Sequence, residues 1–289
     1  MDLILLEKIK RLAVISIVSN DELMEQLVFK GGNAIDLIYQ ISGRASIDLD
    51  FSMEGEFHKD GLEDLRIKIE GSLIEIFRQE GMTVFDVRLI ERPKTISKEF
   101  ADFWGGYRIE FKVIPYDVYS NNVDNIDSLR RNATVVGPRN KRTFEIEISK
   151  FEYCLGKIPK EIDDYTVYVY TTEMLVLEKI RSICQQVPEY KNIVKAHNPV
   201  ARARDFFDIY ILLENFPLDL NDERIKNLLK AIFATKKVPL NYINKVSDQR
   251  EFHRPDFNSV EDTVKSGVDL REFDFYFDYV IDRLQSIKL

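Results

Sequence analysis

Two aspartates separated by one residue, Asp48 and Asp50, are the strongest candidates for chemistry in this sequence. Carboxylates two positions apart on a strand point to the same face of a sheet. Two like charges at that spacing repel each other unless a cation lies between them, and carboxylate oxygens are ligands that Mg²⁺ or Mn²⁺ accepts. Taken alone, the pattern fits a metal site and a solvated strand face equally well.

A glycine turn precedes the aspartates. Gly31 and Gly32 lie between a short apolar run and a predicted helix, with Asn33 directly after them. Adjacent glycines allow a tight turn and close backbone approach, and the N–H groups of the following helix can hold phosphate oxygens. Such a turn alone is more often structural than functional. Followed by the aspartate pair, it supplies both requirements of phosphoryl or nucleotidyl transfer, which are phosphate donors and Mg²⁺ ligands.

Other residues extend this constellation. Arg44 and Ser46, between the turn and the aspartates, are candidate nucleotide contacts. Glu147, on an alternating segment, is our candidate for a third metal-binding carboxylate. Glu145 shares the parity of Glu147, and Glu110 lies on another predicted strand, so both remain alternatives.

The elements that must position these residues follow from hydrophobic periodicity. The predicted helices cover residues 3–19, 21–28, 34–39, 61–80, 172–186, 202–215, 221–235 and 271–288. The predicted strands cover residues 46–52, 83–90, 107–114, 143–149 and 165–170. We expect an irregular excursion over residues 115–142. The pattern indicates an α/β (α+β) fold with a mixed sheet flanked by helices over residues 1–165, then a mainly helical domain over 166–289.

Composition limits the function classes. The net charge of −8 does not attract phosphate backbones in general, so we expect any nucleic-acid contact to be local. No apolar run is long enough for a membrane span, and the acidic N-terminus has no cleavage-site pattern, which predicts a cytoplasmic protein. Cys154 and Cys184 are expected to be buried free thiols. The three histidines show no metal-ligand spacing, and basic residues 139–142 are interpreted as solvated surface.

Four motifs in order carry a family resemblance. Residues 28–35 read Val-Phe-Lys-Gly-Gly-Asn-Ala-Ile, and residues 43–51 read Gly-Arg-Ala-Ser-Ile-Asp-Leu-Asp-Phe. They resemble the AbiEii/AbiGii toxin nucleotidyltransferases, which usually show Lys-Gly-Gly-Thr-Ala-Leu and then Arg-x-Ser-x-Asp-Leu-Asp-Phe. Residues 173–180 are similar to the family's Glu-x-Leu-x-x-Lys helix, and residues 204–210 to its Arg-Asp-Leu-Tyr-Asp-Leu-Tyr.

The resemblance implies a polymerase-β-type nucleotidyltransferase fold and Mg²⁺-dependent transfer of a nucleotide from an NTP to an acceptor hydroxyl. It further implies an RNA or tRNA acceptor and a cognate antitoxin. Lys179 would assist at the triphosphate. Asp205 would act with Lys179 as general base or as an orienter of the lysine, with Asp208 as the alternative.

Two departures from the family leave rival interpretations open. Asn33 replaces the usual hydroxyl residue, which favours a degenerate nucleotide- or RNA-binding protein. The insertion over residues 115–142 is not expected in the family core. A metal-dependent nuclease would use the same acids, and the sequence indicates neither the NTP nor the acceptor.

Overall fold

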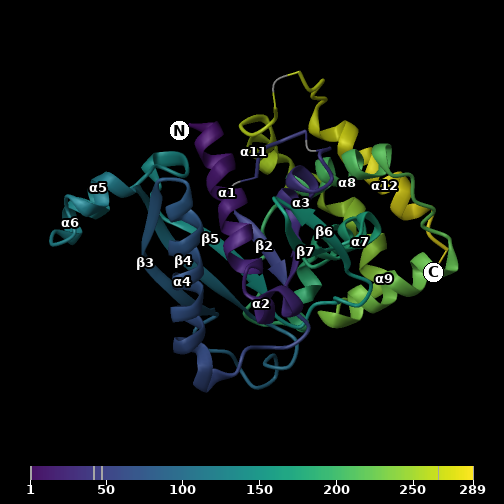
Figure 1. Ribbon diagram of the computed structural model, residues 1–289. Coiled ribbons are helices and arrows are strands. Elements are labelled where there is room, and N and C mark those ends of the chain that lie inside the picture. The colour runs from purple at the N-terminus through teal and green to yellow at the C-terminus, as the bar shows by residue number, and fades with distance from the viewer. Residues whose placement is uncertain (1, 42, 47, 266, 289) are drawn as a thin grey trace. The chain divides into compact units, whose positions relative to one another are not determined.

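The computed structural model describes residues 2–41, 43–46, 48–265 and 267–288 (Figure 1). The chain divides into two compact units. The sheet unit comprises Met1–Asn33 and Ile47–Val169. The helical unit comprises Ala34–Ser46 and Tyr170–Leu289. The fold is mixed α/β with a helical C-terminal region, as the sequence predicts.

The sheet unit is built on a mixed sheet, in which the described residues form seven strands in the order β3-β4-β5-β2-β1-β7-β6. The strands are β1 Val28–Lys30, β2 Leu49–Ser52, β3 Met82–Arg92, β4 Gly106–Pro115, β5 Phe144–Ser149, β6 Ile158–Ile162 and β7 Tyr165–Val169. β2 runs parallel to β5, and β1 runs parallel to β7, whereas the other neighbours are antiparallel. β1 corrects the prediction of a helix over residues 21–28, because α2 (Asp21–Gln26) ends before Val28.

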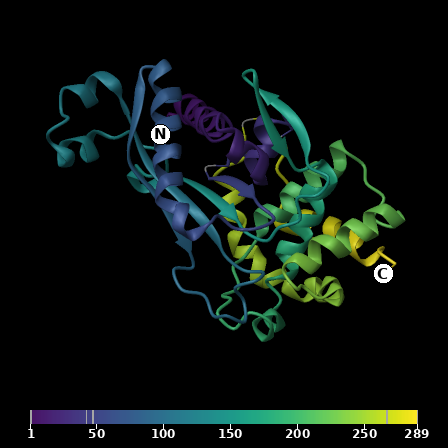
Figure 2. The same cartoon turned by 60° about the horizontal axis from the view of Figure 1, so that its bottom comes forward.

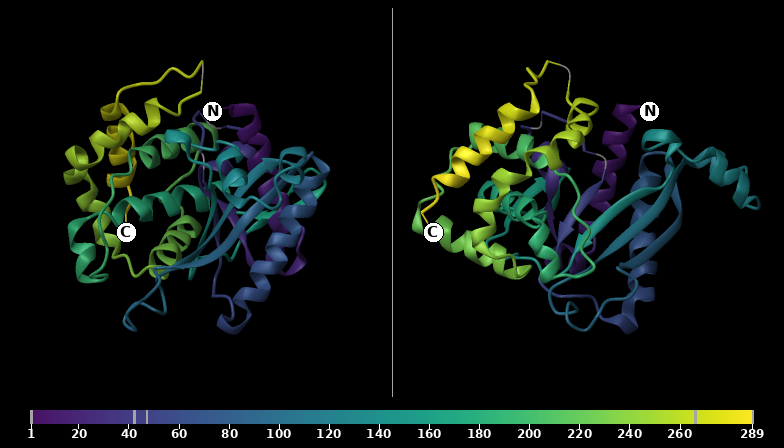
Figure 3. Two further views of the ribbon diagram at one scale, coloured as in Figure 1. Left: turned by 90° about the vertical axis from the view of Figure 1, so that its left-hand side faces the viewer. Right: turned by 180° about the vertical axis from the view of Figure 1, so that it is seen from behind.

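The two faces of the sheet differ because β4 and β5 alternate between buried and half-buried residues. Helices α1 (Leu3–Val18) and α4 (Leu62–Gln79) pack together on the apolar side, where Phe77 of α4 meets Phe111 edge-on at 6.0 Å between ring centroids. Figures 1 and 3 show α4 running alongside β3 and β4. The charged residues of β4 and β5 therefore lie on the opposite face.

The segment expected to be irregular, residues 115–142, contains two short helices. α5 (Tyr116–Ser120) and α6 (Ile126–Asn132) extend away from the end of β4 (Figure 2). Asn125 caps α6 by accepting from the Ser128 N–H at 2.9 Å. The prediction was wrong because each helix is too short to show a helical period, and its asparagines act as caps rather than as helix breakers.

Long helices form the helical unit, and the predicted ones are confirmed. They are α7 Thr172–Cys184, α8 Ala203–Asn215, α9 Glu223–Thr235 and α12 Phe273–Gln285. Shorter pieces lie between α9 and α12, namely η4 Leu240–Gln249, α10 Arg250–His253, η5 Arg254–Phe257 and α11 Asn258–Glu261. Aromatic side chains fill the core, where Phe206 stacks on Phe277 at 5.0 Å between ring centroids.

Residues 34–46 belong to the helical unit although they precede most of the sheet in sequence. Helix α3 (Gly31–Leu37) begins in the sheet unit, and the chain then pairs its backbone with residues 263–265. Ala45 donates to the Thr263 carbonyl at 2.7 Å, and Gly43 accepts from the Lys265 N–H at 2.8 Å. The sequence predicts one domain boundary near residue 165, and it does not predict that residues 34–46 belong to the helical unit.

Two expectations from composition can be compared with the structure. Cys154 and Cys184 are buried and free, as predicted. Within the described ranges, none of the helices combines the length and the apolar character that a membrane crossing requires.

Candidate active site

The glycine turn lies directly against Asp50. Gly31 has a φ of +73°, a left-handed conformation that favours glycine. A Cβ atom at Gly31 would lie 2.5 Å from Asp50 Oδ2. Lys30 lies opposite Asp50 in the antiparallel β1–β2 pair. The structure therefore brings together the turn and one aspartate of the predicted pair.

Gly31→Ala is expected to displace the Asp50 carboxylate as well as to strain the backbone. Gly81→Ala is the matched control, because Gly81 has a φ of +70° and open space around its Cβ position. Both variants should lose about 1–2 kcal/mol of unfolding free energy through backbone strain alone. Urea unfolding should show a larger loss for Gly31→Ala, and nucleotide transfer should fall only in that variant. Equal behaviour of the two variants would contradict a role for the close contact.

Asn33 is fully buried and links three parts of the sheet unit. Its Oδ1 accepts from Lys10 Nζ at 2.9 Å, and its Nδ2 donates to the Asp48 carbonyl at 2.7 Å. The residue that departs from the family pattern is thus used to fix the backbone at Asp48. Sequence reasoning missed Lys10, whose only signal is its place among the apolar residues of the first helix.

Asn33→Leu should lower the unfolding free energy by about 1–3 kcal/mol, because the buried Lys10 ammonium and the Asp48 carbonyl each lose a hydrogen-bond partner. Asn33→Asp keeps an acceptor for Lys10 and loses only the donor to the Asp48 carbonyl. We expect urea unfolding to place this variant between Asn33→Leu and the wild type. Wild-type stability for Asn33→Leu would show that these hydrogen bonds are dispensable.

Asp48 lies just before the strand, not on it. β2 begins at Leu49, which corrects the prediction of a strand over 46–52, and Ile47 of that prediction lies outside the described residues. The Asp48 side chain is 52% exposed, and its Oδ1 lies 3.6 Å from Lys141 Nζ. Lys141 also lies 3.3 Å from Glu145. This lysine was interpreted as solvated surface, since the sequence gives no sign of its approach to Asp48.

Glu147, the predicted third acid, is the Cα partner of Asp50 in the parallel β2–β5 pair. Its Oε1 lies 2.7 Å from Arg108 Nη2. Burial raises the pKa of Glu147 above its usual range; Arg108 opposes the shift, and the negative charges of Glu145 and Asp48 add to it. Glu147 is therefore electrostatically coupled to Asp48.

The alternatives for the third acid both contact the same arginine. Arg108 Nη1 lies 3.6 Å from Glu145 and 3.8 Å from Glu110. Glu110 is the register partner of Glu145, so it lies one strand further from Asp50. The register therefore favours Glu147.

Asp48, Asp50 and Glu147 offer carboxylate oxygens, which are the ligands that a hard divalent cation binds. Asp50 and Glu147 are register partners on adjacent strands, and Asp48 lies just before the strand that carries Asp50. Across the part of the chain that the structure describes, no three His, Cys, Asp or Glu side chains are arranged as ligands of one ion. Arg108 and Lys141 are instead paired with these acids. Asp48, Asp50 and Glu147 remain the residues that would hold Mg²⁺ or Mn²⁺.

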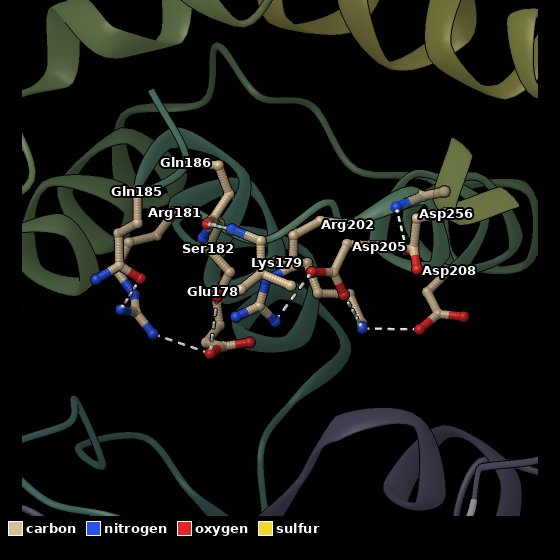
Figure 4. A network of polar contacts seen from close by, with 12 residues as sticks. Glu178, Lys179, Arg181, Ser182, Gln185, Gln186, Arg202, Asp205, Asp208 and Asp256 are labelled. Atoms are coloured by element: carbon tan, nitrogen blue, oxygen red, sulfur yellow. Dashed lines mark hydrogen bonds and ion pairs between the residues drawn. The ribbon is translucent and has the colours of Figure 1, made fainter. Parts of the chain in front are cut away.

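The helical unit contains a second charged cluster, centred on Lys179 of α7 (Figure 4). Lys179 Nζ donates to Asp205 Oδ1 at 2.9 Å and to Asp208 Oδ2 at 2.7 Å. The lysine is 5% exposed. Burial alone would lower the pKa of Lys179, but the attraction of the two carboxylates outweighs it and raises the pKa above its usual range.

Asp208 is held by two cations. Arg44 Nε and Nη2 donate to its two carboxylate oxygens at 2.8 and 2.6 Å. Burial opposes ionisation, but Arg44 and Lys179 outweigh it and lower the pKa of Asp208 to about 2. The guanidinium of Arg44, predicted to contact nucleotide, is thus engaged by a carboxylate of its own unit. Ser46, the other predicted contact from this segment, is half-buried.

Asp205 differs from Asp208 in what its carboxylate can still accept. Both oxygens of Asp208 take hydrogen bonds, whereas Asp205 Oδ2 is buried and has no hydrogen-bond partner. Arg202 Nη1 lies 3.6 Å from that oxygen, beyond hydrogen-bonding distance. Of the two aspartates left open by the sequence, Asp205 is therefore the one with a carboxylate oxygen that has no hydrogen-bond partner among the described residues.

Comparison with solved structures gives matches of low sequence identity. JHP933 from Helicobacter pylori has a TM-score of 0.49 at 16% identity, over 96% of this chain and 88% of its own. A further Helicobacter pylori structure has a TM-score of 0.49 at 14% identity, over 98% and 92% of the two chains. An antigenic nucleotidyltransferase-like protein from Paracoccidioides brasiliensis has a TM-score of 0.33 at 15% identity, over 88% and 94%.

The family assignment comes from the sequence. Comparison with curated proteins gives no match. The model of the family described as "Nucleotidyl transferase AbiEii toxin, Type IV TA system" matches residues 14–279, which include the glycine turn, the aspartate pair and the Lys179 cluster. The chain therefore belongs to the AbiEii toxin family of nucleotidyltransferases.

Proposed function

We propose that this nucleotidyltransferase moves a nucleotide from an NTP to an acceptor hydroxyl in the presence of Mg²⁺ or Mn²⁺. The observation that carries the proposal is the contact of the Gly31 turn with Asp50, together with the Asn33 hydrogen bond to the Asp48 backbone. These contacts join a phosphate-binding turn to the carboxylates of a metal site. Such a combination is what triphosphate chemistry requires.

The proposed roles divide between the two clusters. Gly31, Gly32 and Asn33, which form the turn at the start of α3, would hold the β- and γ-phosphate oxygens through backbone N–H groups. Asp48 and Asp50, helped by Glu147, would hold the divalent cation. When bound, that cation neutralises charge that develops on the triphosphate.

The helical unit would prepare the acceptor. Asp205 Oδ2 takes the proton of the acceptor hydroxyl, whose oxygen then bonds to the α-phosphorus as the bond to the β-phosphate oxygen breaks and pyrophosphate leaves. Lys179 holds Asp205 through Oδ1, which leaves Oδ2 for that proton. Lys179 would also assist at the triphosphate.

For the acceptor we propose RNA, including the 3′ end of tRNA, and for the biological setting a type IV toxin–antitoxin pair. The support is family membership. A cognate antitoxin would be the partner that limits this activity. With a net charge of −8, contact with RNA would be confined to local cationic surface such as Arg202 and Arg204 at the start of α8.

Incubation with each labelled NTP, Mg²⁺ and total RNA tests the proposal. The expected result is labelled RNA of increased length with the wild type and none with Asp48→Asn. RNA shortened by the wild type would indicate a nuclease instead. Uptake of NTP in calorimetry without any labelled product would indicate a binding protein, and either outcome would overturn the proposed transfer.

A further inference from the structure

The start of α8 is capped by residues from another segment of the helical unit. Arg202, which precedes the helix, provides no side-chain cap. Instead, its N–H donates to His253 Nδ1 at 2.9 Å, and the Ala203 N–H donates to Asp256 Oδ2 at 3.0 Å. His253 ends α10 and Asp256 lies in η5, so one short stretch of chain satisfies two N–H groups at this helix end (Figure 4 shows Asp256).

The capped helix start carries Asp205 in its first turn. The Asp205 N–H donates to the Arg202 carbonyl at 2.9 Å, so the backbone of Asp205 is tied to the residue that His253 holds. A carboxylate near a helix N-terminus is stabilised in its charged form. The position of Asp205 Oδ2 therefore depends on the contacts that fix Arg202 and Ala203.

His253 is fully buried, and the protonation state of its ring follows from its contacts. Burial lowers the pKa of His253 to about 4, with the charge of Asp205 opposing the shift and that of Arg202 adding to it. The ring is thus neutral at pH 7. Because Nδ1 accepts a hydrogen bond, the proton lies on Nε2, which is buried and has no hydrogen-bond partner within the described structure.

We infer that His253, supported by Asp256, is a positioning residue for Asp205. It acts through the backbone of Arg202, whose carbonyl accepts from the Asp205 N–H. A neutral ring adds no positive charge to the two cations, Lys179 and Arg202, that already pair with the Asp205 carboxylate. The inference rests on the proposed function to the extent that Asp205 is the proton acceptor.

Paired substitutions test the inference in the full chain. His253→Phe keeps an aromatic ring beside Phe206, whose centroid lies 5.1 Å from that of His253, and removes the acceptor for Arg202. His253→Gln keeps an acceptor oxygen. We expect kcat to fall about 10- to 100-fold in His253→Phe with the KM for NTP unchanged, since a displacement near 1 Å costs this much. We expect His253→Gln to recover most of the loss.

Two further measurements serve as controls. One is the effect of a destabilising substitution in the core, and the other is the position of the proton on the His253 ring. Val260→Ala, in the buried core at α11, is expected to lose stability and to keep its kcat. Nitrogen-15 NMR of His253 should show an unprotonated Nδ1 and a protonated Nε2. A wild-type kcat in His253→Phe, or a protonated Nδ1, would overturn the inference. Absence of transfer by the wild type would instead overturn the proposed function, while the NMR result still decides the cap.

Discussion

Asp50→Asn is expected to lower nucleotide transfer by at least about 1000-fold while the protein stays folded. The asparagine has the size of the aspartate and can keep the packing against Gly31. It loses the negative charge that would hold the divalent cation. A bound cation contributes several kcal/mol of transition-state stabilisation, and about 4 kcal/mol corresponds to roughly three factors of ten in rate.

A measurement of metal binding distinguishes the loss of the cation site in Asp50→Asn from a general disturbance of the sheet. Titration with Mn²⁺, followed by electron paramagnetic resonance, should show much weaker binding in Asp50→Asn than in the wild type. Urea unfolding should show similar stability for both proteins. Wild-type Mn²⁺ affinity together with lost activity would show that Asp50 acts on the nucleotide by another route.

The same assay decides which glutamate is the third acid. Glu147→Gln should weaken Mn²⁺ binding most, because Glu147 is the register partner of Asp50. Glu110→Gln should weaken it least, since Glu110 is separated from β2 by β5. A larger loss for Glu145→Gln than for Glu147→Gln would reassign the role to Glu145.

The parts of the site that could be predicted are those that depend on residues close together in the sequence. The turn and the aspartates are local patterns, because a glycine pair and an alternating Asp-x-Asp each restrict the backbone that carries them. The contact between Gly31 and Asp50 follows from the pairing of β1 with β2, and both strands are adjacent to the motifs. The sequence therefore predicted the turn and the aspartates but not their contact, because β1 was expected to be the end of a helix.

The partners of the site residues could not be predicted in this way. Lys10, Lys141 and Arg108 contact acids or Asn33 only because strands and helices distant in sequence lie together. Nothing in a single sequence distinguishes such a lysine or arginine from a solvated one. Arg44 is the clearest case, since its pairing with Asp208 joins residues that are 164 positions apart.

Segment 34–46 shows the same limit at the level of the fold. Its assignment to the helical unit depends on backbone pairing with residues 263–265, which no local pattern encodes. Two short helices in the 115–142 insertion were missed for the opposite reason, because each is local but too brief to show a period.

Lys179→Met should cause the largest loss of stability. The buried cluster contains two cations, Lys179 and Arg44, and two carboxylates, Asp205 and Asp208. Removing the lysine leaves an uncompensated buried negative charge, which typically costs about 3–5 kcal/mol. Urea unfolding at pH 7 should show this loss.

The pH dependence of stability follows from the same charges. The pKa of Asp208 is lowered to about 2, so its contribution to stability is present above its ordinary pKa and is lost as the pH falls towards 2. The raised pKa of Lys179 contributes stability below its ordinary pKa, which is lost only as the pH rises through the higher folded value. Between these limits the cluster should contribute a constant amount.

A double variant separates the structural role of Lys179 from its catalytic role. Lys179→Met with Asp205→Asn restores charge balance, because the bidentate Arg44–Asp208 pair remains. It should recover much of the stability lost in Lys179→Met, as coupled neighbours are not additive. Nucleotide transfer should be absent from the double variant, because the proposed proton acceptor, Asp205, is gone. Transfer that returns with stability would mean that Lys179 and Asp205 only hold the fold, and the acceptor would then lose its proton to another group.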